Sequence, residues 1–270
     1  MPRRVFILGG SSDIGTALTV RYLQAGCLVA ATYRNPEAFT RLADRSNLYL
    51  YPCDLHDPIS IKSAVLAFCE QVDVWDTFIS CIGTEEPIGK FFDCDFDEWE
   101  SSVVVNSTAQ LRVLHQLYPY RCKGETCNVV FFAGGGTNNA FPSYSAYCVA
   151  KILLIKMCEL LDNENNDFNV FIIGPGFVRT KIHKQTLDRR ETAGPNYERT
   201  VKFLRPDNPG TSFDEIYDCI NWAIGQGREA SGGRNFSVVH DAWRQGGERL
   251  VEKLRGESNK FKLRRFGNED

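Results

Sequence analysis

The 270-residue sequence lacks several features that would assign it to a broad class of protein. It has no apolar run near the roughly 20 residues that a membrane-spanning helix needs. Its N-terminus, MPRRVFILGG, has two arginines but neither the long apolar stretch nor the cleavage site of a secretory signal. Its four histidines do not have the spacing of zinc ligands. We therefore expect a cytoplasmic protein that neither enters a membrane nor holds a metal.

Closely paired cysteines are also missing. Ten cysteines are scattered along the chain, several of them within apolar strand or helix patterns, and none forms a Cys-x-x-Cys pair. This distribution indicates buried, reduced thiols rather than disulfides. The formal net charge of −3 argues against nucleic-acid binding. A hydrophobic content of 43% in a chain of this length is enough for the core of one domain.

Short apolar segments alternate with helical patterns along most of the chain. Such alternation is typical of a parallel sheet with helices on both faces. We predict an α/β fold, a Rossmann-type doubly wound parallel sheet of about seven strands in a single domain. The predicted strands are 4–9, 28–33, 48–52, 76–81, 127–133, 168–173 and 235–239, and the longest predicted helices are 97–118 and 144–162. Ligands of such sheets bind beyond the carboxyl ends of the strands.

The first predicted strand ends in glycine and leads directly into a helix. The run RVFILGG at 4–10 is followed by SSDIG and by TALTVRYLQAG. In this arrangement the amides at the helix N-terminus can hold a pyrophosphate. Gly9 would form the turn, Gly15 would let the helix pack closely, and Asp13 stands where many such loops have a glycine. The alternative is an ordinary turn between a strand and a helix.

Tyr147 and Lys151, in the run YCVAK, are the strongest candidates for chemistry. Residues four apart share one face of a helix. A nearby ammonium stabilises a phenolate, so Lys151 is expected to lower the pKa of the Tyr147 phenol from its usual value of about 10. At about 4 Å and an effective dielectric of about 20, the attraction is roughly 4 kcal/mol. The pair is then a proton-transfer device, unless the spacing is a chance feature of an amphipathic helix.

Four motifs together resemble the short-chain dehydrogenase/reductases over roughly residues 4 to 240. They are LGGSSDIG, Asn106 within VVVNSTAQL, YCVAK, and GPGFVRT at 174–180. The resemblance implies hydride transfer between a nicotinamide cofactor and a carbonyl or secondary alcohol. It also implies that Tyr147 exchanges the proton and that Lys151 binds the nicotinamide ribose. Asn106 would hold a water of the proton relay at a local break in its helix, or else it is a buried structural asparagine.

The same resemblance implies a set of cofactor-binding residues. GPGFVRT would position the nicotinamide through a turn at Pro175 and Gly176, although an ordinary strand-ending turn is the alternative. ISCIG at 79–83 keeps only Gly83 of the family's common Asn-Asn-Ala-Gly. The full predicted set is Gly9, Ser11, Ser12, Asp13, Ile14, Gly15, Arg34, Asp54, Leu55, Gly83, Tyr147, Lys151, Pro175, Gly176, Val178 and Thr180.

One catalytic position departs from the family. Members usually carry a serine about 13 positions before the tyrosine, where its hydroxyl bonds the reacting oxygen, and this chain has Gly134 there. Loss of a positioned donor could cost on the order of 3 kcal/mol in the transition state. Our hypothesis is that Thr137, in FFAGGGTNN, replaces the serine, with Asn138 as a second candidate. A flexible loop without a catalytic donor is the alternative.

The second predicted strand ends in ATYRN, which has no acidic residue to bond the adenosine ribose. Arg34 can instead hold a 2′-phosphate with two hydrogen bonds, so we predict NADP(H) rather than NAD(H). A solvated surface arginine is the alternative. Asp54, in CDL, matches the family position beside the adenine ring or else caps the end of a strand.

A dinucleotide-binding domain is predicted over residues 1–245, with a substrate lid at about 181–212. Between 181 and 205, seven basic residues stand against three acidic ones. This favours a small anionic substrate, such as a phosphate or nucleotide-linked sugar, although the charges of a solvated lid need not do anything specific. Residues 246–270 form a helical and basic C-terminal extension that faintly resembles relatives linked to bacterial surface-carbohydrate biosynthesis. A homodimer or homotetramer fits the family.

The predicted function is therefore NADP-dependent reduction of an anionic, sugar-like ketone. Two alternatives remain open. The missing serine also suits a regulatory protein that binds NADP without turnover, and an isomerase or dehydratase could retain its cofactor.

Overall fold

Seven strands form one sheet in the computed structural model, which describes residues 2–40, 42, 45–245 and 247–265. Neighbouring strands are parallel throughout, in the order β3-β2-β1-β4-β5-β6-β7. The strands are β1 (Arg4–Leu8), β2 (Leu28–Tyr33), β3 (Leu48–Pro52), β4 (Thr77–Ser80), β5 (Cys127–Phe132), β6 (Phe168–Gly174) and β7 (Asn235–Ser237). The predicted Rossmann-type sheet is therefore confirmed. The order reverses between β1 and β4, which is where ligands bind in such sheets.

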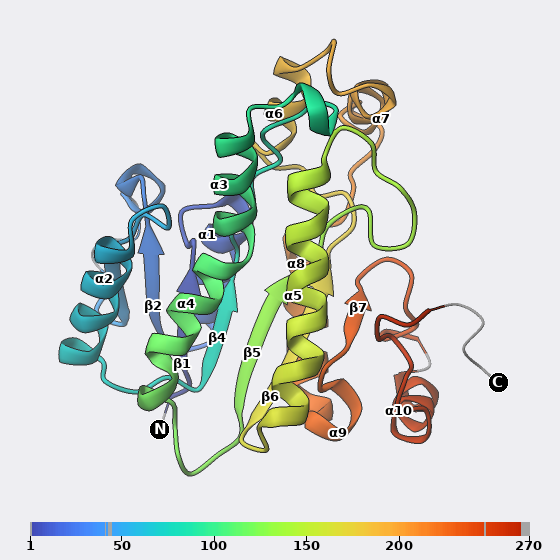
Figure 1. Ribbon diagram of the computed structural model, residues 1–270. Coiled ribbons are helices and arrows are strands. Elements are labelled where there is room, and N and C mark those ends of the chain that lie inside the picture. Colours follow the sequence, from blue (N-terminus) through green and yellow to red (C-terminus); the bar gives the residue numbers. More distant parts are fainter. Residues whose placement is uncertain (1, 41, 43–44, 246, 266–270) are drawn as a thin grey trace.

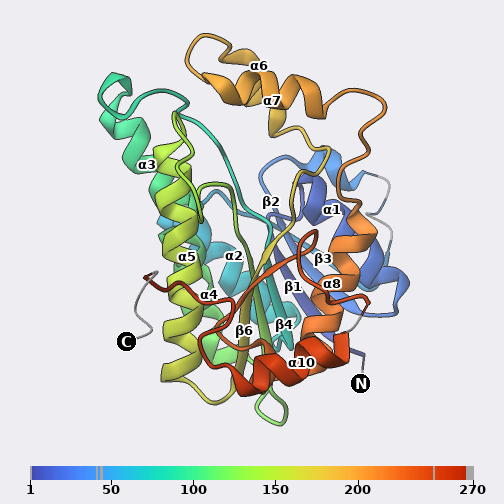
Figure 2. The same ribbon diagram turned by 90° about the vertical axis from the view of Figure 1, so that its right-hand side faces the viewer.

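Helices cover both faces of the sheet, and Figure 2 shows the sheet between the two helical layers. Side chains alternate along each strand, so Val5 and Ile7 of β1 pack into one core, and Phe6 and Leu8 pack into the other. One layer contains α1 (Asp13–Gln24), α8 (Phe213–Gln226) and α9 (Arg228–Ser231), and the other contains α2 (Pro58–Gln71), α3 (Phe96–Asn106), α4 (Thr108–Leu117) and α5 (Ser145–Glu164), as Figure 1 shows. Short 3-10 turns occupy Pro36–Phe39, Phe91–Asp93 and Tyr118–Tyr120.

The segment predicted as one helix over 97–118 consists of two helices. The backbone leaves the helical conformation at Ser107, with φ −142° and ψ −81°, between the end of α3 and the start of α4. The Ser107 hydroxyl donates to the Val103 carbonyl over 2.6 Å, which satisfies an acceptor at the end of α3. A serine can make this local bond to the backbone, which explains why the apolar pattern continues across a break.

The last strand is two residues shorter than its apolar pattern predicts. The Ser237 amide donates to the Asp241 carboxylate over 2.7 Å, and the His240 amide donates to the Ser237 hydroxyl over 3.1 Å. These side chains fold the backbone into a turn directly after Ser237. Val239 is consequently 55% exposed rather than in the sheet.

Two helices, α6 (His183–Asp188) and α7 (Pro195–Phe203), lie over the carboxyl ends of the strands, at the top of Figure 2. They belong to the segment predicted as a lid. The Arg179 guanidinium fastens the connection after α7, because it donates to the carbonyls of Leu204 and Asn208. The lid therefore enters and leaves the domain at one place.

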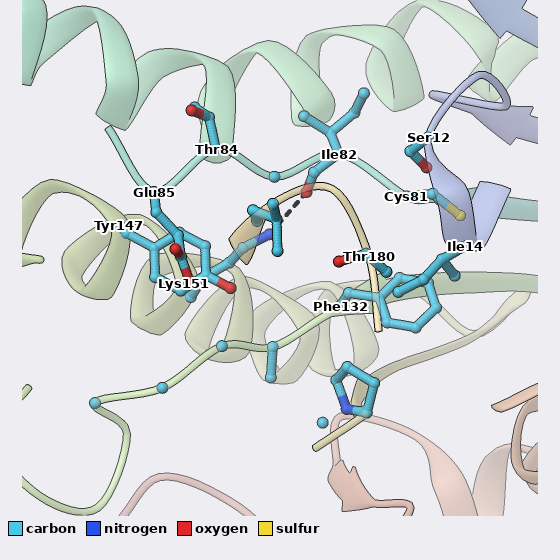
Figure 3. Close-up of a pocket in the computed structure, with 18 of the residues that line it drawn as sticks. Ser12, Ile14, Cys81, Ile82, Thr84, Glu85, Phe132, Tyr147, Lys151 and Thr180 are labelled. Carbon is cyan, nitrogen blue, oxygen red and sulfur yellow. Dashed lines mark hydrogen bonds between the residues drawn. The ribbon is translucent and has the colours of Figure 1, made fainter. Parts of the chain in front are cut away.

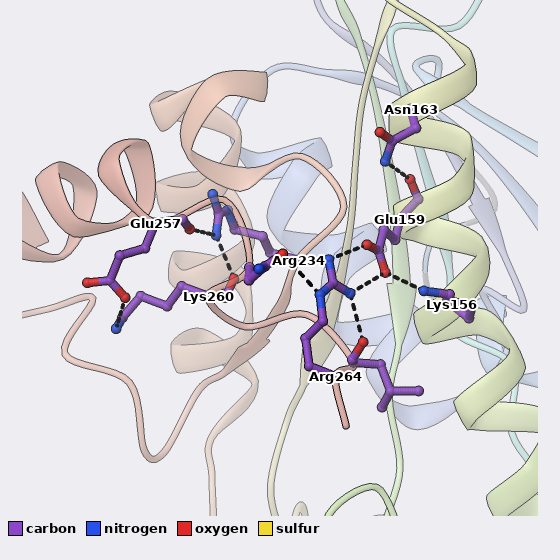
Figure 4. A network of polar contacts seen from close by, with 9 residues as sticks. Lys156, Glu159, Asn163, Arg234, Glu257, Lys260 and Arg264 are labelled. Atoms are coloured by element: carbon purple, nitrogen blue, oxygen red, sulfur yellow. Dashed lines mark hydrogen bonds and ion pairs between the residues drawn. The ribbon is translucent and has the colours of Figure 1, made fainter. Parts of the chain in front are cut away.

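The chain after β7 packs back onto the same domain. The helix α10 (Gly247–Gly256) buries Leu250, Val251 and Leu254 against the core that contains α1 and α8. Beyond α10, Arg264 reaches Glu159 of α5 with two hydrogen bonds of 2.9 and 2.5 Å, and Lys156 donates to the same carboxylate, as Figure 4 shows. In the C-terminal segment, the described residues are thus attached to both helical layers.

All ten cysteines are free in the structure, and most of them are buried. The thiols of the core behave as small apolar side chains, and burial raises the pKa of the Cys53, Cys81 and Cys219 thiols. Within the part of the chain that the structure describes, no helix has the length and apolarity to span a bilayer.

Candidate active site

A large cleft lies at the carboxyl ends of the strands, between the sheet and the lid. Nearly every predicted site residue lines it, including Tyr147, Lys151, Thr137 and Arg34. Two of the predicted residues, Gly15 and Asn106, lie behind its wall instead of lining it. The fold therefore collects predicted site residues from seven separate segments of the sequence around one space.

The glycine-rich loop between β1 and α1 has the geometry of a phosphate cradle. Gly9 has φ +75°, and its amide donates to the Thr32 hydroxyl over 2.9 Å. A Cβ on Gly15 would lie 2.2 Å from the Gly9 carbonyl oxygen, so only glycine lets α1 start this close to the loop. The Ser12 hydroxyl accepts from the Gly15 amide and caps α1. Phosphate groups bind where the amides of a helix N-terminus point into a cleft. The cradle therefore fits the pyrophosphate of a dinucleotide.

The ends of β2 and β3 contribute Arg34, Asp54 and Leu55 to the same cleft. The Asp54 carboxylate accepts hydrogen bonds from the His56 amide (3.0 Å) and approaches the His56 ring nitrogen Nδ1 (2.9 Å). These bonds hold the pKa of Asp54 below its ordinary value. Arg34 lines the cleft and is exposed to solvent.

Tyr147 and Lys151 stand one turn apart on α5 and face the centre of the cleft (Figure 3). Lys151 donates to the Ile82 carbonyl over 2.9 Å, and its Nζ lies 5.6 Å from the centre of the Tyr147 ring. Burial lowers the pKa of Lys151 to about 8. The amine is thus fixed by the loop after β4 rather than by the phenol.

The predicted lowering of the Tyr147 pKa is wrong for this structure. Burial raises the pKa of the phenol above its ordinary value, and the nearby Glu85 carboxylate raises it further. Lys151 does not offset these effects because its amine is directed at the Ile82 carbonyl. The sequence spacing placed the two residues on one face correctly, but it could not show which group the amine would bond.

Asn106 is fully buried at the end of α3 and holds the loop after β4. Its Oδ1 accepts from the Thr84 amide over 2.9 Å, and its Nδ2 donates to the Thr84 carbonyl over 2.9 Å and to the Ser102 hydroxyl over 3.2 Å. The side chain therefore bonds one residue of the loop twice. This contact fixes the backbone of residues 82–84, to which Lys151 is bonded.

The loop after β5 contains Gly134 and Thr137. An added Cβ on Gly134 would lie 2.4 Å from the Tyr147 phenolic oxygen. The Thr137 hydroxyl is 3.4 Å from the Gly134 carbonyl, to which it donates a long hydrogen bond within the loop. Thr137 and Asn138 both line the cleft. The replacement of the serine by Thr137 stays a prediction.

The GPGFVRT segment begins at Gly174, the last residue of β6, and forms part of the wall of the cleft. Gly176 has φ +74°, and Pro175, Val178 and Thr180 line the cleft. The segment continues into the lid, where the Lys181 amide donates to the Asp13 carboxylate over 2.6 Å. Asp13, at the position that is often glycine, therefore ties the lid to the glycine-rich loop.

Two residues of α6 and the residue directly after it contact the segment that follows β4. The Gln185 side chain accepts from the Glu85 amide over 2.7 Å, the Thr186 hydroxyl donates to the Glu85 carboxylate over 2.9 Å, and Arg189 pairs with Glu86 over 3.2 Å. Glu85 was not among the residues predicted from the sequence. Its position two residues after Gly83, at the carboxyl end of a strand, is the signal that could have identified it.

Only some of the basic residues of the lid face the cleft. Lys181, Arg189 and Arg199 line it, and Arg189 is paired with Glu86. Acidic side chains line the opposite side, at Asp97 and Glu98 of α3. Among the described residues, no cluster of histidine, cysteine or acidic side chains is arranged to hold a metal. The charge of the cleft is therefore more mixed than the lid sequence alone indicates.

A family model described as short chain dehydrogenase matches residues 3–191, which include the cradle, Asn106, Tyr147, Lys151 and GPGFVRT. The chain belongs to the short-chain dehydrogenase family. Short-chain dehydrogenases are oxidoreductases that use NAD or NADP, and the cradle and cleft of this chain fit such a dinucleotide. The resemblance expected from the sequence motifs is thereby confirmed.

Individual relatives are distant from this short-chain dehydrogenase. An uncharacterized oxidoreductase of Schizosaccharomyces pombe is 27% identical over 225 residues, which cover 81% of this chain and 89% of the relative. A 3-ketoacyl-(acyl-carrier-protein) reductase of Brucella melitensis, solved with NADH, and a short-chain dehydrogenase of Shigella flexneri, solved with NADP, each have a TM-score of 0.73 at 17% identity. Each match covers 87% of this chain and 96% of the solved chain. These likenesses show the fold.

Proposed function

We propose that this protein is an NADP-dependent reductase of a carbonyl compound, most specifically of an anionic, phosphate- or nucleotide-linked sugar-like ketone. The observation that carries the proposal is that Tyr147 and Lys151 face the cleft that the glycine-rich loop lines. When bound, the nicotinamide dinucleotide supplies the hydride. The chain then has to bind the dinucleotide, orient the carbonyl and supply one proton.

Tyr147 is the proposed proton donor. Its raised pKa keeps the phenol protonated at neutral pH, so a proton is available for the carbonyl oxygen during reduction. Lys151 is the proposed partner of the nicotinamide ribose, and it holds a proton that can replace the one lost by Tyr147. Asn106 sustains this relay because it fixes the backbone at Thr84, next to the loop that Lys151 bonds.

The preference for NADP is supported by Arg34, which is exposed directly after β2, where the sequence Tyr33-Arg34-Asn35 contains no acidic residue. A guanidinium can bind a 2′-phosphate with two charge-assisted hydrogen bonds. An anionic substrate is supported by Arg199 and Lys181, which line the lid side of the cleft. We place the enzyme in the cytoplasm.

The proposed assembly is a homodimer or homotetramer. It is supported by apolar side chains that remain exposed on two neighbouring helices, at Val104 of α3 and at Val149 and Leu160 of α5, each about 40% exposed. Such a face is typical of a surface that a second copy covers.

The test is the absorbance of NADPH at 340 nm in the presence of a panel of ketones, with and without phosphate or nucleotide groups. We expect NADPH consumption by the wild type and at least about 100-fold slower turnover by Tyr147→Phe, which keeps the ring but loses the transferable proton. Lys156→Met, on the exposed side of α5, is the matched control and should retain wild-type rates.

Two other outcomes would replace the proposal. Binding of NADPH without turnover of any carbonyl would identify a regulatory binding protein, which the missing donor at Gly134 would explain. Conversion of a sugar substrate without net change in absorbance would identify an isomerase or dehydratase that retains its cofactor.

A further inference from the structure

Glu85 lies on the wall of the cleft, in the loop after β4, and its carboxylate accepts a hydrogen bond from one hydroxyl group, which in turn bonds a second. Thr186 of the lid donates to its Oε2 over 2.9 Å, and the Tyr144 hydroxyl is 2.8 Å from the Thr186 oxygen. Because Thr186 has only one proton and gives it to Glu85, Tyr144 must donate to Thr186. The chain of bonds therefore runs from Tyr144 to Thr186 to Oε2. Within the described residues, Oε1 makes no hydrogen bond.

The groups that face Glu85 leave its negative charge unpaired. These are the phenols of Tyr144, directly before α5, and of Tyr147, and the thiol of Cys148, whose pKa values are raised by burial and further by the charge of Glu85. The cations nearby are bonded elsewhere. Arg189, directly after α6, pairs with Glu86, and Lys151 donates to the Ile82 carbonyl.

Burial without a cation raises the pKa of Glu85 to about 7, although the Thr186 hydrogen bond opposes the shift. The carboxyl is therefore half protonated near neutral pH. A protonated carboxyl can donate a hydrogen bond, and Oε1 is the oxygen with no partner among the described residues. Figure 3 shows Glu85 beside Tyr147 in the cleft. The protonated carboxyl of Glu85 can thus donate a hydrogen bond in this part of the cleft.

The position that carries the second donor in the family cannot carry one here. Gly134 has no side chain, and the Tyr147 ring occupies the adjacent space. The nearest hydroxyl in that loop, on Thr137, donates to the Gly134 carbonyl. The carbonyl oxygen of a substrate bonded to Tyr147 must therefore receive its second hydrogen bond from a residue on another wall of the cleft.

We propose that the protonated carboxyl of Glu85 donates this second hydrogen bond to the reacting oxygen of the substrate, beside Tyr147. The inference rests on the proposed reductase function. During reduction the phenol transfers its proton to the substrate oxygen, while the Glu85 proton stays on the carboxyl and stabilises the developing negative charge. Glu85 must then be protonated for the enzyme to be fully active.

The test compares kcat/KM for ketone reduction between about pH 5.5 and pH 9 in the wild type and in variants of this carboxylate. In the wild type we expect activity to fall as the pH rises through about 7, because Glu85 loses its proton in that range. Glu85→Gln should keep at least a tenth of the low-pH activity without this fall, because its amide donates a hydrogen bond at every pH. In Glu85→Ala, kcat/KM at low pH should fall by about 100-fold, as it does in other enzymes that lose a hydrogen-bond donor to an oxyanion.

Glu86→Gln is the matched control, because it removes the neighbouring carboxylate, which is 43% exposed and paired with Arg189. It should keep the wild-type pH profile. Circular dichroism and NADPH binding establish that each variant is folded. A second readout is infrared spectroscopy of the free protein, in which a protonated-carboxyl band should disappear through about pH 7 in the wild type and be missing from Glu85→Gln.

The proposal is overturned if Glu85→Ala reduces the ketone as fast as the wild type, or if Glu85→Gln keeps the wild-type fall in activity. The proposal is also overturned if kcat/KM falls by about 100-fold in Thr137→Val but not in Glu85→Ala, because Thr137 is then the donor. These outcomes differ from failure of the proposed function itself, in which the wild type reduces no carbonyl and Tyr147→Phe has no effect to compare.

Discussion

The phenol of Tyr147 fills the space beside Gly134 in which a side chain at position 134 would lie. A Cβ built on Gly134 would come within 2.4 Å of both the phenolic oxygen and a ring carbon of Tyr147. Atoms that are not bonded do not approach this closely. The missing serine and the position of the Tyr147 ring are therefore two aspects of one packing arrangement.

Restoring the family's serine should consequently damage this enzyme rather than improve it. In Gly134→Ser the new side chain must displace the Tyr147 ring, so we expect kcat for ketone reduction to fall by at least about 30-fold while the Kd for NADPH changes less than about threefold. The control is Gly135→Ala, whose Cβ would meet the Phe141 ring at 3.4 Å, an ordinary contact. A Gly134→Ser variant that is faster than the wild type would contradict this packing argument.

The fold was predictable because its signals are local and repeated. Each strand is a short apolar run of the kind that is buried on both faces, and each helix between strands has its own periodic pattern. Departures occurred where a polar side chain bonds the backbone. Ser107 interrupts a helix and Asp241 ends a strand, and neither bond is visible in the apolar pattern.

The candidate site was predictable only as far as the motifs extend. Motif spacing identified residues that line one cleft, including Tyr147 and Lys151. It could not give the direction of the Tyr147 pKa shift, because that depends on burial and on Glu85, which lies 62 positions away in the sequence. Glu85 itself had no motif. Its environment is formed by α5 and α6, which come together only in the folded chain.

Arg34 should determine the choice between NADP and NAD. If its guanidinium binds the 2′-phosphate, Arg34→Ala loses two hydrogen bonds to a charged group, and solvent screening at this exposed position reduces their combined contribution to about 1.5–3 kcal/mol. We expect the Kd for NADPH to rise by about 10- to 100-fold, and the Kd for NADH to change less than about twofold. Fluorescence titration measures both constants. Arg45→Ala, an exposed arginine outside the cleft, should change neither, and equal losses for both cofactors in Arg34→Ala would refute the assignment.

Lys151 should take up a proton when the cofactor binds. Its pKa in the free protein is lowered to about 8, so the amine is mostly neutral at pH 8.5. The negative charges of a bound dinucleotide favour the charged amine and raise the pKa again. Calorimetry in buffers of different ionisation enthalpy should therefore show uptake of about half a proton at pH 8.5 and less at pH 7. Lys151→Met should show none, and Lys156→Met should resemble the wild type; uptake that persists in Lys151→Met would assign the proton to another group.

The ion pair between Arg264 and Glu159 should stabilise the C-terminal segment in a pH-dependent way. Arg264 and Lys156 lower the pKa of Glu159 to about 2, so the pair contributes fully above the ordinary pKa of about 4.5 and its contribution is lost as the pH falls towards 2. Because the Arg264 side chain is 35% exposed, solvent screening reduces the contribution to about 1–2 kcal/mol. Arg264→Ala should therefore lower Tm by about 2–6 °C at pH 7, and the difference from the wild type should shrink between pH 4.5 and pH 3.

Arg255→Ala is the control. It removes an ion pair with Glu229 that is 4.0 Å long and largely exposed, so it should leave Tm unchanged. If the two variants unfold alike at pH 7, the bidentate contact of Figure 4 does not hold the segment in solution.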